Sequence, residues 1–418
     1  DGNHLEESGG DGGMKWEKVK LGDVCEITSS KRIFYSEYVD DGVPFYRSKE
    51  IIESDEGKII ENPLYISVDK YNEIKEKYGV PQTGDMLLTS VGTIGIPYII
   101  KKKDCFYFKD GNLTWFRDFR EGLNSKYLYY WIKSSEGTGT LYNTTIGSSQ
   151  KALTISALKN IKVSLPPRSV QDKIVEVVSA YDNLIENNQK QIKLLEEAAQ
   201  RLYKEWFVDL CFPGHENTKI VDGVPEGWNW CKLEDAIQLD PKVTLTKERM
   251  KQFIPMSALS TSSMVLDESQ FTETTSNSGS KFQNGDTLLA RITPCLENGK
   301  TAYVSGLKSD EGAVGSTEYI VMRAKTINSY MVYLLARTDD FRQSAINSMS
   351  GSDGRQRVKS DKLKMLDYLH PTSELVEKFE NVEEPIFEKI YRLSKQMQQA
   401  KQARDLLLPK LMSGEVEV

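Results

Sequence analysis

Three segments come close to known catalytic or cofactor-binding patterns, and each departs from its pattern at a decisive residue. Residues 294–301, PCLENGKT, end like a phosphate-binding loop, but Pro294 stands where glycine must turn backbone N–H groups onto phosphate. The Pro-Pro at 166–167 lies in LPPR and lacks the flanking residues of an amino-methyltransferase tetrad. Asp286 and the ENGK at 297–300 suggest a metal-dependent nuclease, but the tight Glu-x-Lys spacing is missing. We therefore expect a non-catalytic chain, with the nuclease as an alternative.

The cysteines and histidines offer little for metal or acid–base chemistry. The five cysteines are far apart, odd in number and without a C-x-x-C pair, which is typical of a reducing compartment. Only three histidines are present. We therefore expect no metal site and no cofactor in this chain. No run of 18 apolar residues occurs, so we expect no contact with a membrane and a cytoplasmic location.

The chemistry that the sequence does offer is recognition. Short loops combine Lys or Arg with amides, hydroxyls and Gly or Ser, the mixture that contacts the phosphates and base edges of double-stranded DNA. In the first part of the chain the candidate DNA-binding residues are Lys31, Arg32, Tyr35, Arg47, Ser48, Lys49, Ser90, Gly92, Thr93, Ser148, Ser149, Gln150 and Lys151. In the second part they are Arg249, Lys251, Arg291, Thr293, Ser316, Ser352, Arg355 and Gln356.

Four of these residues are the preferred base readers. Arg suits the acceptor pair of guanine, and Gln suits adenine. The four are Arg47, Gln150, Arg291 and Gln356. For any single residue the alternative is an ordinary solvated loop, so the repeated clustering supports the set more than its members.

The elements that must position these loops are arranged as a repeat. The matching pairs share residues and order along the chain: WEKVKLGDV at 16–24 with WNWCKLEDA at 228–236, QTGDMLL at 82–88 with QNGDTLL at 283–289, and SALKNIKVSLPP at 156–167 with SDKLKMLDYLHP at 360–371. Between them lie short β-branched runs separated by Gly, Asn and Asp, and a helical pattern at 126–135 and 329–338. The sequence therefore predicts two similar α+β globules, each followed by a long helix.

Both long stretches carry an apolar stripe at coiled-coil spacing. The seam residues are Val178, Tyr181, Ile185, Asn188, Ile192, Leu195 and Leu202 in the first helix, and Ile386, Ile390, Leu393, Met397 and Leu407 in the second. Two such stripes in one chain favour an antiparallel coiled coil that holds the globules apart. The helix from 170 to 206 would span roughly 50 Å. A coil that only dimerises is the alternative.

Length and composition agree with several folded domains. The chain has 418 residues, of which 39% are hydrophobic and 28% charged. Residues 1–13 are Gly-rich and acidic, so we expect a tag remnant there and a native start at Met14. The formal net charge is −7, and four of the acidic residues lie in that segment, so the rest is nearly neutral. We predict globules at 14–168 and 213–371 and helical segments at 169–212 and 372–418.

In its organisation the sequence resembles the specificity subunits of Type I restriction–modification enzymes. The resemblance covers 14–418 and rests on LPPRSVQDKIVEVV (165–178), LLEEAAQRLYKEWF (194–207), PEGWNWCKLED (225–235), QTGDMLLTSVGTIG (82–95) and the C-terminal LLLPKLMSGEV. It implies two similar mixed α/β target recognition domains with pseudo-twofold symmetry, separated by two long helices that form an antiparallel coiled coil. Each domain would read one half of a bipartite DNA target, and the helices would set the gap.

The resemblance also implies partners. The helices of such chains dock two modification (methyltransferase) subunits, which use S-adenosylmethionine, and restriction/translocase subunits use ATP and Mg. The family's recognition loops correspond here to Arg47 and Lys49, 90–93, 148–151, 291–293 and 352–356. ARITP at 290–294 lacks the Val-Gly-x-Ile-Gly form of the first copy. The alternative from another class is a coiled-coil scaffold that binds proteins and no DNA.

Overall fold

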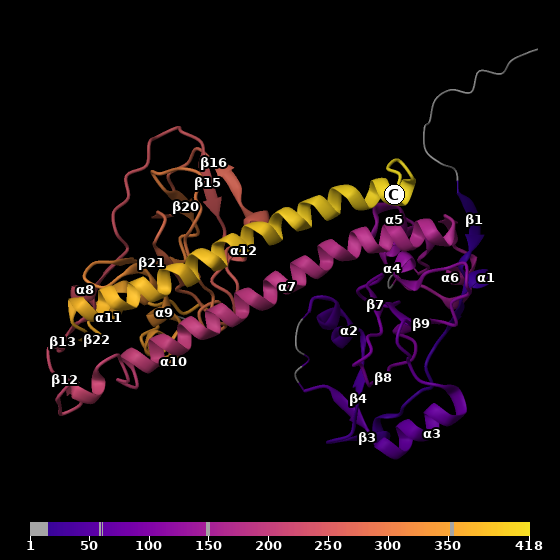
Figure 1. Ribbon diagram of the computed structural model, residues 1–418, viewed down its shortest axis with the longest axis horizontal. Coiled ribbons are helices and arrows are strands. Elements are labelled where there is room, and N and C mark those ends of the chain that lie inside the picture. Colours follow the sequence, from indigo (N-terminus) through magenta and orange to yellow (C-terminus); the bar gives the residue numbers. More distant parts are fainter. Residues whose placement is uncertain (1–15, 58–59, 61, 148–150, 352–354) are drawn as a thin grey trace, which may run out of the picture. The chain divides into compact units, whose positions relative to one another are not determined.

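The computed structural model describes residues 16–57, 60, 62–147, 151–351 and 355–418, so the expected tag remnant lies outside the described residues. The chain folds as two compact units (Figure 1). The first unit consists of Asp1–Glu186 with Gln399–Val418, and the second of Asn187–Gln398. Each contains one globule and parts of two long helices, α7 (Arg168–Phe207) and α12 (Ser373–Ser413).

Two four-stranded sheets form the described part of the first globule. One is antiparallel, in the order β2 (Glu26–Thr28), β9 (Leu113–Arg117), β6 (Met86–Thr89) and β7 (Pro97–Ile99). The other has the order β3 (Tyr38–Val39), β5 (Leu64–Ile66), β4 (Val43–Tyr46) and β8 (Tyr107–Phe108), with β4 and β8 parallel. Its helices are α1 (Leu21–Val24), α2 (Ser48–Asp55), α3 (Val68–Tyr78), α4 (Ser125–Lys133), α5 (Ser135–Thr144), α6 (Ile155–Asn160) and the 3-10 turn η1 (Tyr35–Glu37).

The second globule repeats this plan. Its antiparallel sheet has the order β14 (Ile237–Leu239), β21 (Tyr319–Ala324), β18 (Thr287–Ala290) and β19 (Thr301–Tyr303). Its second sheet has the order β16 (Thr272–Thr274), β15 (Lys251–Ile254), β20 (Ala313–Gly315) and β17 (Ser280–Phe282), with β15 and β20 parallel. Its other elements are η2 (His215–Asn217), β11 (Ile220–Val221), β12 (Val224–Pro225), α8 (Leu233–Ala236), η3 (Met256–Ala258), η4 (Glu268–Gln270), α9 (Ser329–Arg337), α10 (Asp339–Asn347) and α11 (Ser360–Lys364). The antiparallel sheets match strand for strand, whereas the mixed sheets share three strands and differ in the fourth, which is β3 beside β5 in the first globule and β17 beside β20 in the second. The sequence repeat is therefore a repeat of most of the topology.

The two short helices that the pattern predicted are α4 and α9. Each begins after an Asn whose side chain caps the helix: Asn124 accepts a hydrogen bond from the N–H of Lys126, and Asn328 accepts one from the N–H of Met331. Each buries its apolar face in the core of its globule, with Trp131 on α4 fully covered. These helices anchor the sheets that carry the loops.

The strand that opens each globule pairs with the strand that closes it. β1 (Glu17–Lys20) is antiparallel to β10 (Lys162–Leu165), and β13 (Asn229–Lys232) is antiparallel to β22 (Asp367–His370). β10 leads directly into α7, and β22 leads into α12. Each globule is therefore tied to the start of one long helix.

The long helices α7 and α12 pack together and run antiparallel. In the first unit the guanidinium of Arg404 lies 2.8 Å from the carboxylate of Asp182, so the start of α7 meets the end of α12. In the second unit Phe379 contacts the rings of Tyr203 and Trp206, so the end of α7 meets the start of α12. All the predicted seam residues are buried or half-buried, as a shared apolar interface requires.

Membrane insertion has no support from the helices. Within the described ranges, no helix combines the length and the apolar character that crossing a bilayer needs.

Candidate nucleic-acid interface

The first unit brings two of the predicted loops together at one open groove. The groove has a volume of about 470 Å³. It is lined by Ser48, Lys49, Ile52, Glu53, Glu56, Val91, Gly92, Thr93 and Asn112. One wall is therefore α2, and the other is the loop that follows β6.

The wall formed by α2 is fixed by its first turn. The backbone N–H of Arg47 donates to Glu50 at 2.7 Å, and the guanidinium of Arg47 lies 2.6 Å from the same carboxylate. Burial raises the pKa of Glu50, but the hydrogen bonds from Arg47 lower it more, so the pKa lies below its usual value. Arg47 is thus committed to an ion pair, while Lys49 beside it is exposed at the groove.

The opposite wall is a tight glycine turn. The hydroxyl of Ser90 is buried and lies 2.6 Å from the hydroxyl of Thr114, which holds the base of the loop to the sheet. Gly92 has a φ of +79°, a left-handed conformation that glycine adopts without strain. Gly92 and Thr93 are exposed at the tip. Thr93 can therefore reach a ligand in the groove, and buried Ser90 only positions it.

A third predicted segment reaches the same loop. Ala152 forms antiparallel bridges with Val91 and with Ile146, and the N–H of Leu153 donates to the carbonyl of Ser90 at 2.9 Å. Lys151, next to Ala152, is exposed and lies over the ring of Tyr142, with its Nζ 3.6 Å from the ring centre. Ser148, Ser149 and Gln150 lie outside the described residues. The 47–49, 90–93 and 151 segments are therefore neighbours in the folded chain.

The second unit builds the same junction from different side chains. Arg357 bridges Ile292 and Ser350, matching Ala152 with Val91 and Ile146. The N–H of Thr293 donates to the carbonyl of Gln356 at 3.2 Å. The loop at 290–294 therefore takes the same place as 89–93, although it lacks the glycines of the first copy.

Charges at the second junction are largely paired. The guanidinium of Arg357 lies 2.7 Å from Glu318, and this hydrogen bond holds the pKa of the Glu318 carboxyl below its usual value. Arg291 donates to the carbonyl of Val358 at 2.9 Å, so its guanidinium is folded onto the loop. Arg355 is exposed and Gln356 half-buried, whereas Ser352 lies outside the described residues.

The remaining candidates divide between surface and interior. Lys31, Arg32 and Tyr35 are exposed in the loop between β2 and β3, and Arg249 is exposed in the connection between β14 and β15. Lys251, by contrast, is buried, and its ammonium donates to the carbonyl of Thr275 at 3.1 Å. Ser316 is half-buried, and its hydroxyl accepts the N–H of Glu318. Lys251 and Ser316 are therefore engaged within the fold and are not part of the candidate surface.

Four groove residues were missed by the sequence analysis: Ile52 and Glu53 on α2, Glu56 just after it, and Asn112. Asn112 lines the groove from the turn between β8 and β9, and its carbonyl accepts the N–H of Ser90 at 2.8 Å. The signal for Asn112 was the Asp-Gly-Asn turn at 110–112, placed between two aromatic strands.

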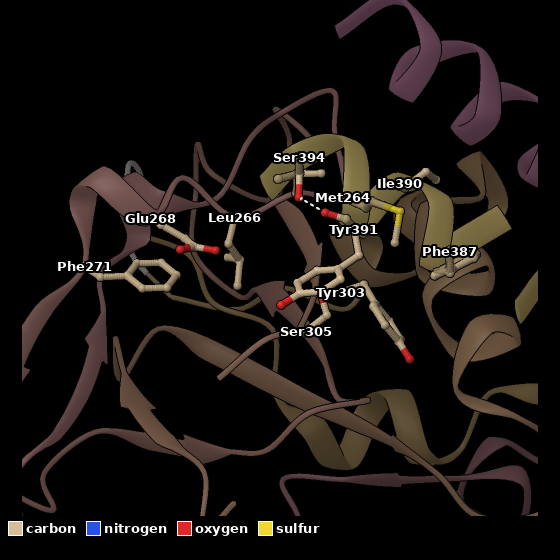
Figure 2. A pocket seen from close by; sticks show the side chains of 11 residues that line it. Met264, Leu266, Glu268, Phe271, Tyr303, Ser305, Phe387, Ile390, Tyr391 and Ser394 are labelled. Atoms are coloured by element: carbon tan, nitrogen blue, oxygen red, sulfur yellow. Dashed lines mark hydrogen bonds between the residues drawn. The ribbon is translucent and has the colours of Figure 1, made fainter. Parts of the chain in front are cut away.

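A pocket in the second unit lies between the loop at 264–271 and α12 (Figure 2). Its apolar side chains include Tyr303, Phe387 and Ile390, and its lining residue Glu268 forms an ion pair with Lys395. Its volume of about 20 Å³ has room for about one water molecule. This pocket is therefore a packing seam between globule and helix.

The acidic residue considered for a nuclease is engaged in the fold. Asp286 is buried, and both its carboxylate oxygens accept hydrogen bonds from Arg323 at 2.6 Å. Asp85 occupies the matching turn and accepts the indole N–H of Trp115. Over the described part of the chain, no group of three or more His, Cys, Asp or Glu side chains could hold a metal ion. In both units the Asp of the repeated Gln-x-Gly-Asp turn therefore stabilises the fold through hydrogen bonds.

Comparisons with known proteins agree on one family. The sequence model described as Type I restriction modification DNA specificity domain matches residues 14–197. The Type I restriction enzyme MjaIX specificity subunit of Methanocaldococcus jannaschii is 27% identical, over 96% of this chain and 94% of that protein. The Type I restriction enzyme EcoAI specificity subunit of Escherichia coli is 35% identical over 32% of this chain and 24% of that protein.

The fold is shared with a solved structure as well. The S subunit of a Type-I restriction-modification system from M. genitalium has a TM-score of 0.60 at 14% identity, and the match covers 96% of this chain and 97% of that one. Likeness at this identity is a likeness of fold, and it agrees with the sequence matches. In sequence and in fold, the chain is thus similar over nearly its whole length to Type I restriction enzyme specificity subunits.

Proposed function

We propose that this chain is the DNA sequence-recognition subunit of a Type I restriction–modification complex, and that each globule reads one half of a bipartite, asymmetric target. One observation carries the proposal. Both units build the same loop junction, bridged at Val91–Ala152 and at Ile292–Arg357, and present different side chains on it. A shared scaffold with different contacts is what two unlike half-sites require.

The side chains on the two junctions support different readouts. In the first unit Lys49, Thr93 and Lys151 offer cations and a hydroxyl around the groove. In the second unit Arg355 and Gln356 replace them, and a Gln amide can pair with adenine. Phosphate contacts would come from the lysines, and base readout from the amide and hydroxyl groups.

The surface charge favours binding only within an assembly. Glu53 and Glu56 share a groove wall with Lys49, so the groove is not strongly basic. Affinity for DNA rises with the number of phosphates neutralised. We propose that the isolated chain binds DNA weakly and that partner subunits supply the remaining positive charge.

The helix pair is proposed as spacer and docking platform. Its seam is buried, while Leu194 on α7 and Leu406 on α12 are exposed, with exposed fractions of 64% and 72%. Because the seam is covered, a protein partner would contact the outer faces of the helices, where these two leucines lie. In this proposal two methyltransferase subunits dock on the helices, and restriction/translocase subunits join them.

The proposal assigns no chemistry to this chain. S-adenosylmethionine, ATP and Mg would be held by the partner subunits in the cytoplasm. The recognition domains would be 14–168 and 213–371, and the spacer segments 169–212 and 372–418. The protein-only scaffold is not supported by the proteins to which the chain is similar.

Co-expression with its cognate adenine methyltransferase tests the proposal. Methyladenine is mapped across the host genome at single-base resolution, and a split motif with a fixed gap is expected. Replacing 14–168 with the equivalent domain of a similar specificity subunit should change one half of the motif and leave the other half intact. An active methyltransferase that binds the chain but leaves no new methylation would refute sequence recognition. Cleavage of DNA by the isolated chain with Mg²⁺ would instead favour the nuclease.

A further inference from the structure

Two neighbouring aromatic side chains project from the first globule into solvent. Tyr35 has an exposed fraction of 89% and Phe34 one of 62%. Single exposed apolar residues are ordinary, but an adjacent pair of aromatic rings leaves a large apolar area in water. The pair is therefore a candidate contact surface.

The turn that presents these rings is held in place. Ile33, just before them, is buried in the core, and the N–H of Lys31 donates to the hydroxyl of buried Tyr107 at 2.6 Å. The N–H of Phe34 donates to the carboxylate of Glu37 at 2.8 Å, and the N–H of Glu37 donates back to the carbonyl of Phe34 at 2.9 Å. A fixed turn presents the rings without a further entropy cost on binding.

The loop that carries the pair is connected by an ion pair to a turn that lines the groove of the first unit. The rings of Tyr35 and Tyr38 are in edge contact, with centres 5.8 Å apart. Arg32 forms a 2.8 Å ion pair with Asp110, and two residues further on Asn112 lines the groove. The turn at 110–112 thus supports both the groove and the loop that carries the rings.

The charges beside the rings favour an anionic, flat ligand. Lys31 and Arg32 are exposed next to Phe34. The nearby carboxylates Glu37 and Asp110 are each paired with a cation, Glu37 with Lys70 at 3.0 Å. Arg32 is itself paired with Asp110, and the ammonium of Lys31 lies 4.4 Å from the centre of the Tyr78 ring, but both side chains remain exposed to solvent. Aromatic rings flanked by exposed cations are suited to stacked bases and their phosphates.

The second unit has a counterpart in the equivalent connection between strands. Met250 lies there with an exposed fraction of 57%, next to Arg249, which forms a 2.6 Å ion pair with Glu311. Methionine also serves as an apolar wedge between base pairs. An exposed apolar side chain next to an ion-paired arginine is therefore present in both units.

We propose that Phe34 and Tyr35 form an aromatic wedge that enters the duplex beside the half-site read by the first groove, unstacks one base step and bends the DNA. This rests on the proposed function, and it adds a deformation to the direct contacts of the groove. Sequence preference at the wedged step would then come from the cost of unstacking, which is lowest at pyrimidine–purine steps.

The test uses the assembled methyltransferase complex and a duplex that carries its mapped target, with 2-aminopurine placed in turn at each position in and around the first half-site. Wild type should raise the fluorescence at one step. Combined Phe34→Ala and Tyr35→Ala changes should abolish that rise, weaken binding roughly tenfold and reduce the bend measured by end-to-end energy transfer. Tyr35→Phe should keep the signal. Trp230→Ala, at an exposed aromatic of the second unit, is the matched control and should change nothing.

The outcomes separate this inference from the function on which it rests. A complex that methylates its split target without unstacking any step overturns the wedge and leaves the recognition function standing. Loss of methyltransferase assembly in the double variant would show that the rings contact protein and would also overturn it. Absence of any methylated target would refute both the wedge and the DNA-recognition function.

Discussion

Glu383 is a buried acid in an apolar place. It lies on α12, one helical turn from Phe379 and from Phe387, and all three side chains are buried. Neither carboxylate oxygen has a hydrogen-bond partner among the described residues. Burial raises the pKa of Glu383 to about 7. The folded second unit is therefore more stable when Glu383 is protonated and neutral.

The stability of the protein should accordingly fall as the pH rises from 5 to 8. Folding raises the pKa of Glu383 from 4.5, so the folded state binds the proton more tightly than the unfolded state does. The free energy of unfolding therefore falls as the pH rises from the pKa of the unfolded state through the pKa of the folded state. The loss is about 3 kcal/mol over this range. Urea unfolding at a series of pH values measures it. Glu383→Gln should flatten the curve, whereas Glu384→Gln, at the exposed neighbour, should not; equal curves for wild type and Glu383→Gln would contradict the assignment.

The two kinds of DNA contact should respond differently to alanine. Lys49→Ala should weaken binding by the complex similarly at every sequence and reduce the salt slope by about one charge, as expected of a phosphate contact. Gln356→Ala should cost about 1–3 kcal/mol and relax one position of the second half-site. Methylation mapping and salt-dependent binding read these out, with Lys162→Ala, an exposed cation on β10, as control. If Lys49→Ala instead relaxed the specificity at one position of the target, Lys49 would be a base reader and not a phosphate contact.

Several residue roles could not be predicted from residue type. Lys251 and Ser90 have the same polar character as their exposed neighbours, but strand pairing turns Lys251 toward Thr275 and Ser90 toward Thr114. Those partners are 24 residues away in sequence, beyond any local pattern. The pairing of Arg47 with Glu50 was readable, because a Glu three residues after the cap closes the first turn of a helix.

At the scale of elements, the helix pair was the most predictable feature. Its apolar stripe repeats over many turns, so the whole pattern indicates a helix even where a short stretch alone would also fit a strand. The strands are short and were predicted only as a class, because their register depends on partners far along the chain. Asn188 interrupts the stripe, and its amide donates to Gln396 at 3.1 Å within the second unit. A buried polar pair of this kind fixes the register of a coil.

Asn188→Leu should therefore raise the thermal stability of the chain and loosen the register of the helices. A leucine buries more apolar surface than an asparagine does, which stabilises the helix pair. Without the amide of Asn188, other registers of the two helices are no longer disfavoured. Calorimetry measures the first effect, and methylation mapping measures the second as targets with more than one gap length. Asn187→Leu, at the exposed neighbour, should do neither. A more stable variant with a single unchanged gap would mean that Asn188 does not set the register.

A longer helix pair should widen the unread gap. Seven residues inserted after Glu186 in α7, with seven before Gln399 in α12, preserve the apolar stripe and add about 10 Å. That length corresponds to roughly three base-pair rises. Methylation mapping should give the same two half-sites with a wider gap. Insertion in α7 alone should break the pairing and abolish methylation; an unchanged gap in the paired variant would rule out the spacer role.

At the scale of the whole molecule, the repeat in the sequence predicted two similar globules, and the structure has them, with the same strand order in the antiparallel sheet and a different fourth strand in the other sheet. The sequence did not indicate that the end of the chain completes the first unit. Leu408, Leu411 and Met412 share one buried cluster with Val178 and Leu158. This choice of partner is set by which apolar faces fit, and hydrophobic periodicity alone does not encode it.

This discontinuity has a consequence during synthesis. The ribosome synthesises the first globule early, but it makes the helical segment that closes this unit only after roughly 200 residues of the second unit, an interval on the order of ten to forty seconds at bacterial rates. Throughout that time the apolar side chains of the face around Val178 remain exposed to solvent. A nascent chain that stops short of residue 399 keeps this face exposed, and chaperones and proteases can recognise it. Synthesis beyond residue 399 is thus coupled to burial of this apolar face, so that a chain ending earlier lacks a finished first unit.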